Sequence, residues 1–320
     1  MTHSNKGKRI IFVSGAPRSG TTLIQNMLDS HPDIFGGPEF LHIPDILKLR
    51  SVLHRSIDRE WIDLICSYTD VDQAICSFLE RLLLPLADKN GCKFLSEKSP
   101  QNIVIFPELV RLFPEARFIH VIRDPRAIVA SMLQVGKRAR GKNVRAQRFT
   151  RDINSAINYV RTCFDAGFAA AKTASSQVYT ICFEQLISDP KKETKKVCDF
   201  LHLDWSPQMI RPGDLKHLGE KAATVKSNEI WYDIETYRSN PNTGSILKWK
   251  TTLTLTQQVA IISAFKDHQE LSRLGYDLSL NGLPRRRRIY YMSLGRLSRL
   301  SYKTSRHIFS LVRRTLRKLS

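Results

Sequence analysis

The segment that most constrains the fold is IIFVSGAPRSGTTLIQNML, residues 10–28. It begins with an apolar run typical of a buried β-strand, continues through a turn, and ends with an amphipathic helical pattern. Gly15 and Gly20 have the spacing of a nucleotide-binding P-loop, in which backbone N–H groups and a helix N-terminus hold phosphate oxygens. The segment predicts an α/β fold that begins with a phosphate-binding loop. An ordinary Gly- and Pro-rich turn between a strand and a helix is the alternative.

One position in this loop departs from the pattern of ATPases. An ATPase carries a lysine there that reaches the β- and γ-phosphates, whereas this chain has Thr21. Arg18 supplies the positive charge inside the loop instead. We therefore expect the loop to hold a nucleotide whose reactive group is not a γ-phosphoryl group. The predicted contacts are Arg18, Ser19, Gly20, Thr21 and Thr22.

A second segment, ARFIHVIRDPRAIVASML, predicts a second phosphate site. A buried-type strand over residues 117–122 ends just before Arg123, and the helix that follows carries Ser131. Ligands of doubly wound sheets bind beyond the carboxyl ends of the strands, so this loop and the first can face one ligand. The Arg123 guanidinium and the Ser131 hydroxyl suit a terminal phosphate. A salt bridge between Arg123 and Asp124 or another acid is the alternative.

The basic charge of the chain is concentrated at its C-terminal end. The length of 320 residues, 42% of them apolar, suits one α/β domain at 1–284 followed by a tail at 285–320. The tail has twelve Lys and Arg residues and no acid, which leaves a net charge of +8 out of +20 in the rest of the chain. Its apolar residues recur at helical spacing, which predicts a basic amphipathic helix or pair of helices.

Two explanations of the tail stay open at this stage. It can bind an anionic membrane surface, or it can pack on the domain with its basic face in water. No nucleic-acid partner is expected, because the tail lacks a recognised DNA- or RNA-binding motif.

The N-terminus and the cysteines indicate a cytoplasmic protein. Residues 1–9 are polar and the apolar run after them is too short for a signal peptide. The six cysteines show no CxxC spacing, and several lie in apolar runs, so we expect reduced, buried thiols and no metal site. The expected location is the cytoplasm, peripheral to the inner face of the membrane if the tail binds lipid.

PRSGTTL and RDPRAIVAS together resemble the 5′- and 3′-phosphate loops of sulfotransferases that use 3′-phosphoadenylyl sulfate (PAPS). Within that superfamily the chain is most similar to the tyrosylprotein sulfotransferases, over roughly residues 9–280. Further matching stretches are RLFPEARFIHVIRDPRA, FEQLISDP, SILKWK and SRLGYD. The resemblance implies a P-loop-like, doubly wound, mainly parallel sheet flanked by helices. It also implies PAPS as co-substrate, no metal, and sulfuryl transfer to a tyrosine hydroxyl.

The resemblance assigns the reacting groups to three residues. Glu39 matches the family's catalytic base, although Pro38 replaces the first glutamate of the usual doublet. Lys98, in SEKSP, matches the lysine that faces the leaving phosphate and the bridging oxygen, where negative charge grows. Arg18 would share that task from the P-loop. A solvated loop charge is the alternative for Lys98.

The resemblance also assigns contacts on the far side of the cofactor. Lys248, in SILKWK, would contact phosphate, and Trp249 would anchor that loop by packing. The family uses a serine upstream of this lysine at the reaction centre. Ser227 is the candidate here, with Ser239 competing. Phe183 stands where the family has a tyrosine near the adenine, and it keeps a stacking face.

The predicted acceptor is a tyrosine in an acidic peptide or protein. Residues 137–151 form a basic stretch without acids beside the predicted 3′-phosphate site, and such a surface attracts acidic residues. A solvated basic loop is the alternative. The chain lacks the membrane anchor and disulfide pattern of the secretory enzymes, and Gly36 stands where they have a cysteine. A bacterial-type enzyme acting before export fits these departures, and the resemblance implies a homodimer.

Two other function classes stay open from the sequence. A small-molecule or carbohydrate sulfotransferase would use the same cofactor loops with a differently placed base, for which His42 and His120 are candidates. A membrane-associated nucleotide-binding scaffold would depend on the tail alone. It would leave Glu39 and Lys98 without a task.

Overall fold

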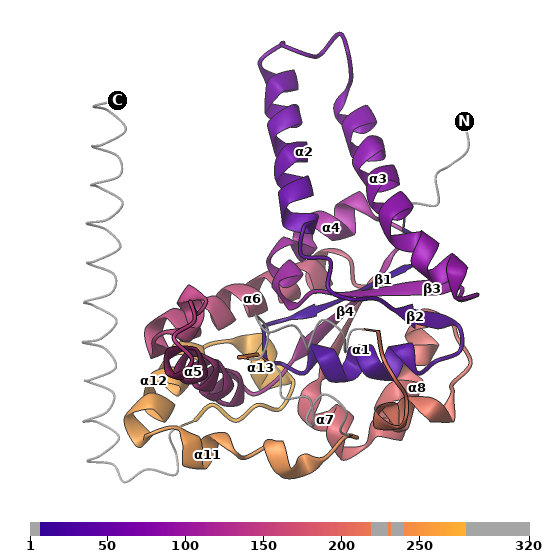
Figure 1. The fold of residues 1–320 in the computed structure, drawn as a ribbon. Helices are drawn as coiled ribbons and strands as arrows, with labels where there is room; N and C mark the ends of the chain where they lie inside the picture. The colour runs from indigo at the N-terminus through magenta and orange to yellow at the C-terminus, as the bar shows by residue number, and fades with distance from the viewer. Residues whose placement is uncertain (1–6, 219–229, 232–239, 280–320) are drawn as a thin grey trace, which may run out of the picture. The chain divides into compact units, whose positions relative to one another are not determined.

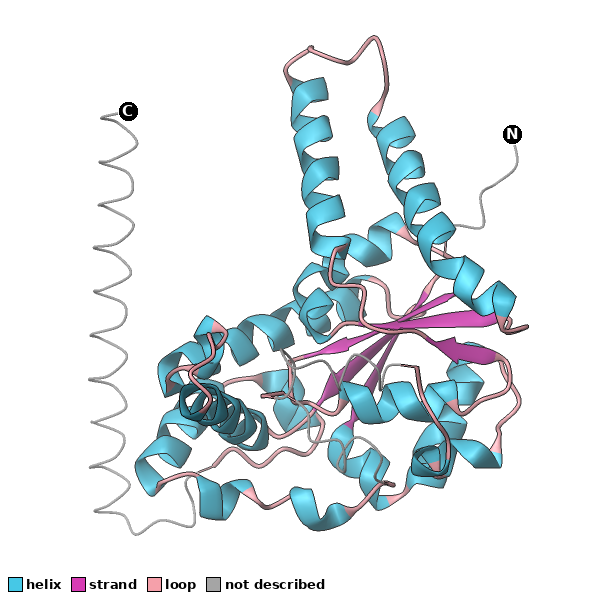
Figure 2. Cartoon of the chain, in the orientation of Figure 1, coloured by secondary structure: helices cyan, strands magenta, loops and turns pink. Residues whose placement is uncertain are grey.

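One parallel sheet of five strands organises the chain in the computed structural model, which describes residues 7–218, 230–231 and 240–279. The strand order is β2-β3-β1-β4-β5, and every neighbouring pair is parallel. The strands are β1 (Ile10–Gly15), β2 (Ile34–Gly36), β3 (Phe94–Lys98), β4 (Arg117–Ile122) and β5 (Val178–Cys182). β1 is central, with β3 and β4 on its two sides (Figure 2). The predicted doubly wound, mainly parallel sheet is confirmed.

Helices connect the strands and cover both faces of the sheet (Figure 1). In the described residues up to 248, the α-helices are α1 (Thr21–Asp29), α2 (Ile43–Asp58), α3 (Tyr68–Lys89), α4 (Phe106–Leu112), α5 (Pro125–Gly141), α6 (Ile153–Thr173), α7 (Phe183–Ser188) and α8 (Pro190–Leu201). Short 3₁₀ helices are η1 (Pro100–Ile105), η2 (Arg148–Thr150), η3 (Pro207–Ile210), η4 (Pro212–Asp214) and η6 (Thr243–Ser245). Within the described ranges, none of the helices is both long enough and apolar enough to cross a membrane.

The central strand is buried on both faces, as its continuous apolar run predicts. Ile11 and Val13 belong to a core cluster with apolar residues of α1 and α8. Phe12, between them, faces the other side, where its ring lies 5.1 Å from that of Phe118 and 5.5 Å from that of Phe113. Alternating residues of one strand therefore hold a separate apolar layer on each face, and this fixes the strand that leads into the P-loop.

α2 and α3 pack side by side and extend away from the sheet as a helical hairpin (Figure 1). Helical periodicity at 40–50 and 60–88 predicts both helices, but the connection runs from Arg59 to Ser67, so α3 begins later than the pattern suggests. Ser67 sets its start, because its Oγ accepts from the backbone N–H of Asp70 in a capping box. The hydrophobic pattern extends into the connection between the two helices, so the periodicity predicts a longer helix than the structure contains.

The chain divides by its internal contacts into residues 1–248 and 249–320. The second unit contains α11 (Trp249–Thr252), α12 (Leu255–Phe265) and α13 (Gln269–Arg273). α12 starts at a capping box between Thr254 and Gln257. The predicted boundary after residue 284 and the basic tail at 285–320 lie outside the described residues.

The six cysteines are free thiols in the structure. Cys76, Cys163, Cys182 and Cys198 are buried, as the sequence predicts. Cys66 and Cys92 are half-buried, because both lie in connections at the ends of α3 rather than in the core.

Candidate active site

The P-loop and the Arg123 loop meet at one edge of the sheet. β1 and β4 are neighbours, and Gly15 pairs in register with Val121, so both strands end at the same level. A Cβ atom on Gly15 would lie 2.2 Å from the Val121 carbonyl oxygen. Glycine is therefore required where the P-loop leaves the sheet beside β4. The predicted convergence of the two loops on one ligand follows from this pairing.

The turn of the P-loop leaves donors directed at a possible phosphate. Gly20 is the N-cap of α1 with φ +105°, and no side chain caps the first backbone N–H groups of the helix. The buried Ser19 Oγ has no hydrogen-bond partner among the described residues. A Cβ on Gly20 would lie 2.2 Å from the ring of Phe183, so the aromatic face closes directly over the glycine. A helix N-terminus with an unsatisfied hydroxyl beside it fits a phosphate group.

Arg18 joins the two predicted phosphate sites. It has a left-handed backbone conformation, φ +77°, within the turn. Its Nε donates to Ser131 Oγ at 3.0 Å, and its Nη1 donates to the Trp231 carbonyl oxygen at 2.6 Å. Arg123 Nη1 in turn donates to the Arg18 carbonyl oxygen at 3.4 Å. Three residues predicted to bind the cofactor, from β1–α1, β4–α5 and α5, are therefore in direct contact.

The Arg123 guanidinium is held by carbonyl oxygens and an aromatic ring. Its Nη2 donates to the Ser245 carbonyl oxygen at 3.0 Å, and its Cζ lies 4.2 Å from the centre of the Phe183 ring. Asp124 forms its ion pair with Arg126 at 2.7 Å. The alternative pairing of Arg123 with Asp124 is therefore not the arrangement in the structure. A guanidinium at this position beside a P-loop suits an anionic ligand.

Glu39 and Lys98 form an ion pair at the same edge of the sheet. Lys98 is the last residue of β3 and its Nζ bonds to Glu39 Oε1. The side chain of Lys98 is only 7% exposed and that of Glu39 is 22% exposed. Ser14 Oγ, at the start of the P-loop, donates to the Ser99 carbonyl oxygen at 2.7 Å. The proposed base and the proposed leaving-group lysine therefore adjoin the P-loop, although they lie 59 residues apart in the chain.

The residues predicted for the far side of the cofactor are only partly described. Lys248 is exposed and follows η6, whose Ser245 carbonyl accepts the hydrogen bond from Arg123. Trp249 is buried at the start of α11. Ser227 and Ser239 both lie outside the described residues. The choice between these two serines therefore stays a prediction.

The structure contradicts one of the alternative bases. His120 is completely buried, its ring lies 5.1 Å from that of Phe168, and neither ring nitrogen has a hydrogen-bond partner in the described ranges. Burial lowers the pKa of His120 to about 3. This histidine fills the core between β4 and α6 and cannot reach an acceptor. His42, just before α2, is exposed and lies 3.8 Å from Asp45.

Glu97 is a site residue that motif reasoning missed. It is 2% exposed, and burial raises its pKa to about 7, with the nearby charge of Glu39 acting in the same direction. Hydrogen bonds from Ser99, Phe40 and Asn102 act in the opposite direction. The signal was present in the strand sequence FLSEK. Three polar residues end a central parallel strand, where an apolar run is usual.

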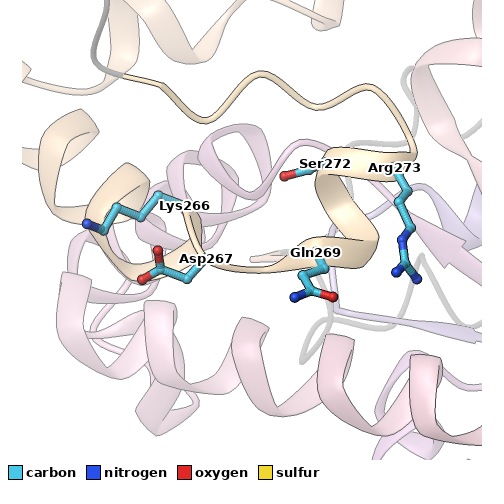
Figure 3. A pocket seen from close by; sticks show the side chains of 5 residues that line it. All are labelled: Lys266, Asp267, Gln269, Ser272 and Arg273. Carbon is cyan, nitrogen blue, oxygen red and sulfur yellow. The ribbon is translucent and has the colours of Figure 1, made fainter.

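Two further observations concern metal binding and a pocket in the second unit. No group of three or more His, Cys, Asp or Glu side chains could hold a metal ion in the part of the chain that the structure describes. A cavity of about 450 Å³ in the second unit is lined by Lys266, Asp267, Gln269, Ser272 and Arg273 (Figure 3). None of the predicted site residues lines it.

Comparison with known proteins agrees with the fold and the loops. Residues 10–207 match the model of the sulfotransferase family, so the chain belongs to this family and is a sulfotransferase. The matched range contains both predicted phosphate loops, Glu39 and Lys98.

Relatives in animals are named protein-tyrosine sulfotransferases. Protein-tyrosine sulfotransferase 1 of Homo sapiens is 30% identical over 285 residues, which cover 85% of this chain and 71% of that protein. Protein-tyrosine sulfotransferase 1 of Danio rerio is 29% identical over 281 residues, which cover 87% of this chain and 75% of the relative. The resemblance inferred from the short motifs is thereby confirmed.

Solved structures share the fold at lower sequence identity. The sulfotransferase domain of the Synechococcus PCC 7002 olefin synthase matches with a TM-score of 0.57 and 20% identity, over 87% of this chain and 98% of that domain. The sulfotransferase domain from the curacin biosynthetic pathway matches with a TM-score of 0.56 and 19% identity, over 84% and 98%. Both comparisons support the fold alone.

Proposed function

We propose that the chain transfers the sulfuryl group of PAPS to a tyrosine hydroxyl in an acidic peptide or protein. The observation that carries this proposal is the Glu39–Lys98 ion pair beside a P-loop without the ATPase lysine, in a chain whose relatives are named protein-tyrosine sulfotransferases. The pair puts a carboxylate, which can accept a proton, next to an ammonium group, which can stabilise developing negative charge.

The donor would lie across the P-loop and the Arg123 loop. Backbone N–H groups at the start of α1 and the buried Ser19 Oγ would hold the 5′-phosphate. Arg123 and Ser131 would bind the 3′-phosphate, and Phe183 offers an apolar ring beside them. Lys248 would contact phosphate from the loop after η6. PAPS supplies the sulfuryl group, and the chain supplies the anion site that positions it.

Transfer requires removal of the phenol proton and stabilisation of the leaving phosphate. A phenol has a pKa of about 10, so its oxygen needs a base as it attacks the sulfur in line. Glu39 would take that proton. The S–O bond to the phosphate breaks as the new S–O bond forms, and Lys98 and Arg18 would neutralise the charge that develops on the leaving phosphate. Ser227, or Ser239, would complete the reaction centre.

The acceptor peptide would be attracted by the basic segment that follows Ser131. Exposed arginines and lysines run from the C-terminal half of α5 into the loop before α6, without an acid among residues 137–151. Acidic side chains around the tyrosine would be drawn to this surface, with a faster encounter and a higher affinity at low salt.

An acceptor screen tests this function. Purified protein with ³⁵S-labelled PAPS is expected to label an acidic peptide that contains tyrosine, and not the same peptide with phenylalanine at that position. A peptide with its acids replaced by lysine is expected to be a poorer substrate, because the basic surface repels it. Labelling of sugars, lipids or steroids without labelling of the peptide would instead support the carbohydrate or small-molecule alternative.

The basic tail is proposed as a contact with anionic membrane from the cytoplasmic side. Each basic residue near such a surface contributes about 1 kcal/mol, and salt screens the attraction. The full chain is expected to float with phosphatidylglycerol vesicles at low salt. A chain without residues 285–320 is expected to remain in the bottom fraction of the gradient. Equal flotation of both proteins would contradict this role.

A homodimer also stays a prediction of the family resemblance.

A further inference from the structure

Glu97 is a buried carboxylate one residue before the carboxyl end of β3, and its neighbours must offset the free-energy cost of burying its charge. Its Oε1 accepts hydrogen bonds from Ser99 Oγ at 2.5 Å and from the Phe40 backbone N–H at 3.3 Å. Its Oε2 accepts from Asn102 Nδ2 at 3.2 Å. The sulfuryl transfer described above gives this carboxylate no task, although it precedes Lys98 directly in β3.

The hydrogen bond from Phe40 fixes the segment that carries Glu39. Residues 37–40, after β2, have no regular structure, and besides the Glu39–Lys98 ion pair, backbone hydrogen bonds hold them on both sides of Glu39. On one side the Gly37 N–H donates to the Ser96 carbonyl oxygen at 3.2 Å. On the other side the Phe40 N–H donates to Glu97. Glu39 lies between the two anchors, so losing the second anchor releases the segment next to the proposed base.

The charge of Glu97 also acts on the proposed base. Among the described residues, the charge that acts on Glu97 is that of Glu39, from the loop after β2, and Glu39 in turn pairs with Lys98. The groups that donate hydrogen bonds to the Glu97 carboxylate, which are Ser99, Asn102 and the Phe40 backbone N–H, are neutral. Two carboxylates at close range repel each other, so arrival of the phenol proton on Glu39 relieves repulsion from an ionised Glu97.

We propose that Glu97 is a positioning residue for sulfuryl transfer, which holds the Glu39 segment through the Phe40 N–H and places a second negative charge behind the base. This inference rests on the proposed function, because it gives Glu39 the role of base. Glu97 is buried and its oxygens are bonded to Ser99, Phe40 and Asn102, so the proposal gives it no contact with the donor or the acceptor.

The test compares Glu97→Gln with wild type and with Glu193→Gln. Glu193 is a matched control, since it is also a buried glutamate but lies in α8 and pairs with Lys196 at 2.6 Å. Turnover of the acidic peptide is measured from pH 5.5 to 8.5, together with donor affinity by calorimetry. Thermal unfolding and hydrogen exchange of the segment 37–41 are followed in the same proteins.

Glu97→Gln is expected to lower kcat by about 10²-fold, the loss typical of a displaced reacting group, with donor affinity within about twofold of wild type. Wild-type kcat should rise as the pH passes about 7, where Glu97 ionises, and the variant should lack this step. The segment 37–41 should exchange faster, because the neutral amide oxygen of glutamine accepts the Phe40 N–H more weakly than a carboxylate does. Glu193→Gln should keep the pH step and the exchange rate of this segment.

The pH dependence of thermal unfolding distinguishes a positioning role of Glu97 from a purely structural role. The folded protein holds the Glu97 proton to a higher pH than the unfolded chain, so wild-type stability falls as the pH rises from about 4.5 through 7. At pH 8 the Gln variant should therefore unfold at a higher temperature than wild type while being a poorer enzyme. Lower activity with equally lower stability and donor affinity would overturn the proposal.

Normal kcat with the pH step retained would also overturn it. If Glu97→Gln does not fold, Glu97→Asp keeps the charge and shortens the reach, so the pH step should persist at a reduced kcat. If the wild type labels no tyrosine peptide, the proposed function fails. The hydrogen-exchange comparison still decides whether Glu97 holds the Glu39 segment.

Discussion

Replacing Glu39 by glutamine is expected to reduce sulfuryl transfer to tyrosine by about 10²–10⁴-fold, the range that general base catalysis contributes. Glutamine has nearly the same shape but cannot accept the phenol proton. Donor binding should be unchanged or tighter, because Glu39 holds the Lys98 ammonium group and glutamine holds it less firmly. Single-turnover kinetics with labelled donor measures the first effect, and calorimetry with 3′,5′-adenosine bisphosphate measures the second.

A matched control variant tests whether the loss of activity is specific to Glu39, the proposed base. Glu108→Gln removes a carboxylate that pairs with Arg50 at 2.8 Å in the region of α2, away from the P-loop, and should leave turnover near wild type. Near-normal turnover of Glu39→Gln would exclude Glu39 as the base and would direct attention to the exposed His42. Loss of donor affinity in step with activity would mean that glutamine had disturbed the cofactor site instead.

Replacing Lys98 by methionine is expected to lower kcat by about 10²–10³-fold, corresponding to about 2.7–4 kcal/mol of transition-state stabilisation. The lysine is almost fully buried at the end of β3, so in the proposed mechanism its charge would act on the leaving phosphate in a poorly solvated place. Methionine keeps most of the apolar volume and removes the charge. Steady-state kinetics with the acidic peptide measures the effect.

The ion pair requires that Lys98 and Glu39 be tested together. If both act in one transfer step, the double variant Lys98→Met, Glu39→Gln should be much less impaired than the product of the two single effects. Multiplication of the two losses would show that the residues act independently, against a shared reaction centre. Lys98→Arg should recover part of the activity, since it keeps the charge with a different reach.

The central sheet was predictable because burial on both faces leaves a simple pattern. The mainly apolar segments 10–14 and 117–122 became β1 and β4, whose side chains pack on two opposite faces. β2 was not predicted. It has only three residues, and a pairing that short leaves no periodicity to detect.

The cofactor site was only partly predictable, for a related reason. Arg18, Arg123 and Ser131 belong to motifs, and the structure brings them into contact. Their other partners are the carbonyl oxygens of Trp231 and Ser245, which any residue could supply. A hydrogen bond to a backbone carbonyl oxygen does not depend on the type of the accepting residue, so the sequence cannot predict it. His120 was wrong as a candidate base, because residues of α6 cover it completely. The sequence alone could not show this packing.

The sequence by itself determined the strand–turn–helix of residues 10–28 with Thr21 at the ATPase lysine position, the strand that ends at Arg123, and the family, since each depends on residue types at short, fixed spacings. Only the tertiary structure decided that Lys98 pairs with Glu39, that Asp124 pairs with Arg126, and that Glu97 holds Phe40. The physical reason is the strand order. β1 lies between β3 and β4, so the carboxyl ends of strands that are far apart in the chain meet at one edge of the sheet. Which side chains pair there depends on their distances in space, and these cannot be read from the sequence.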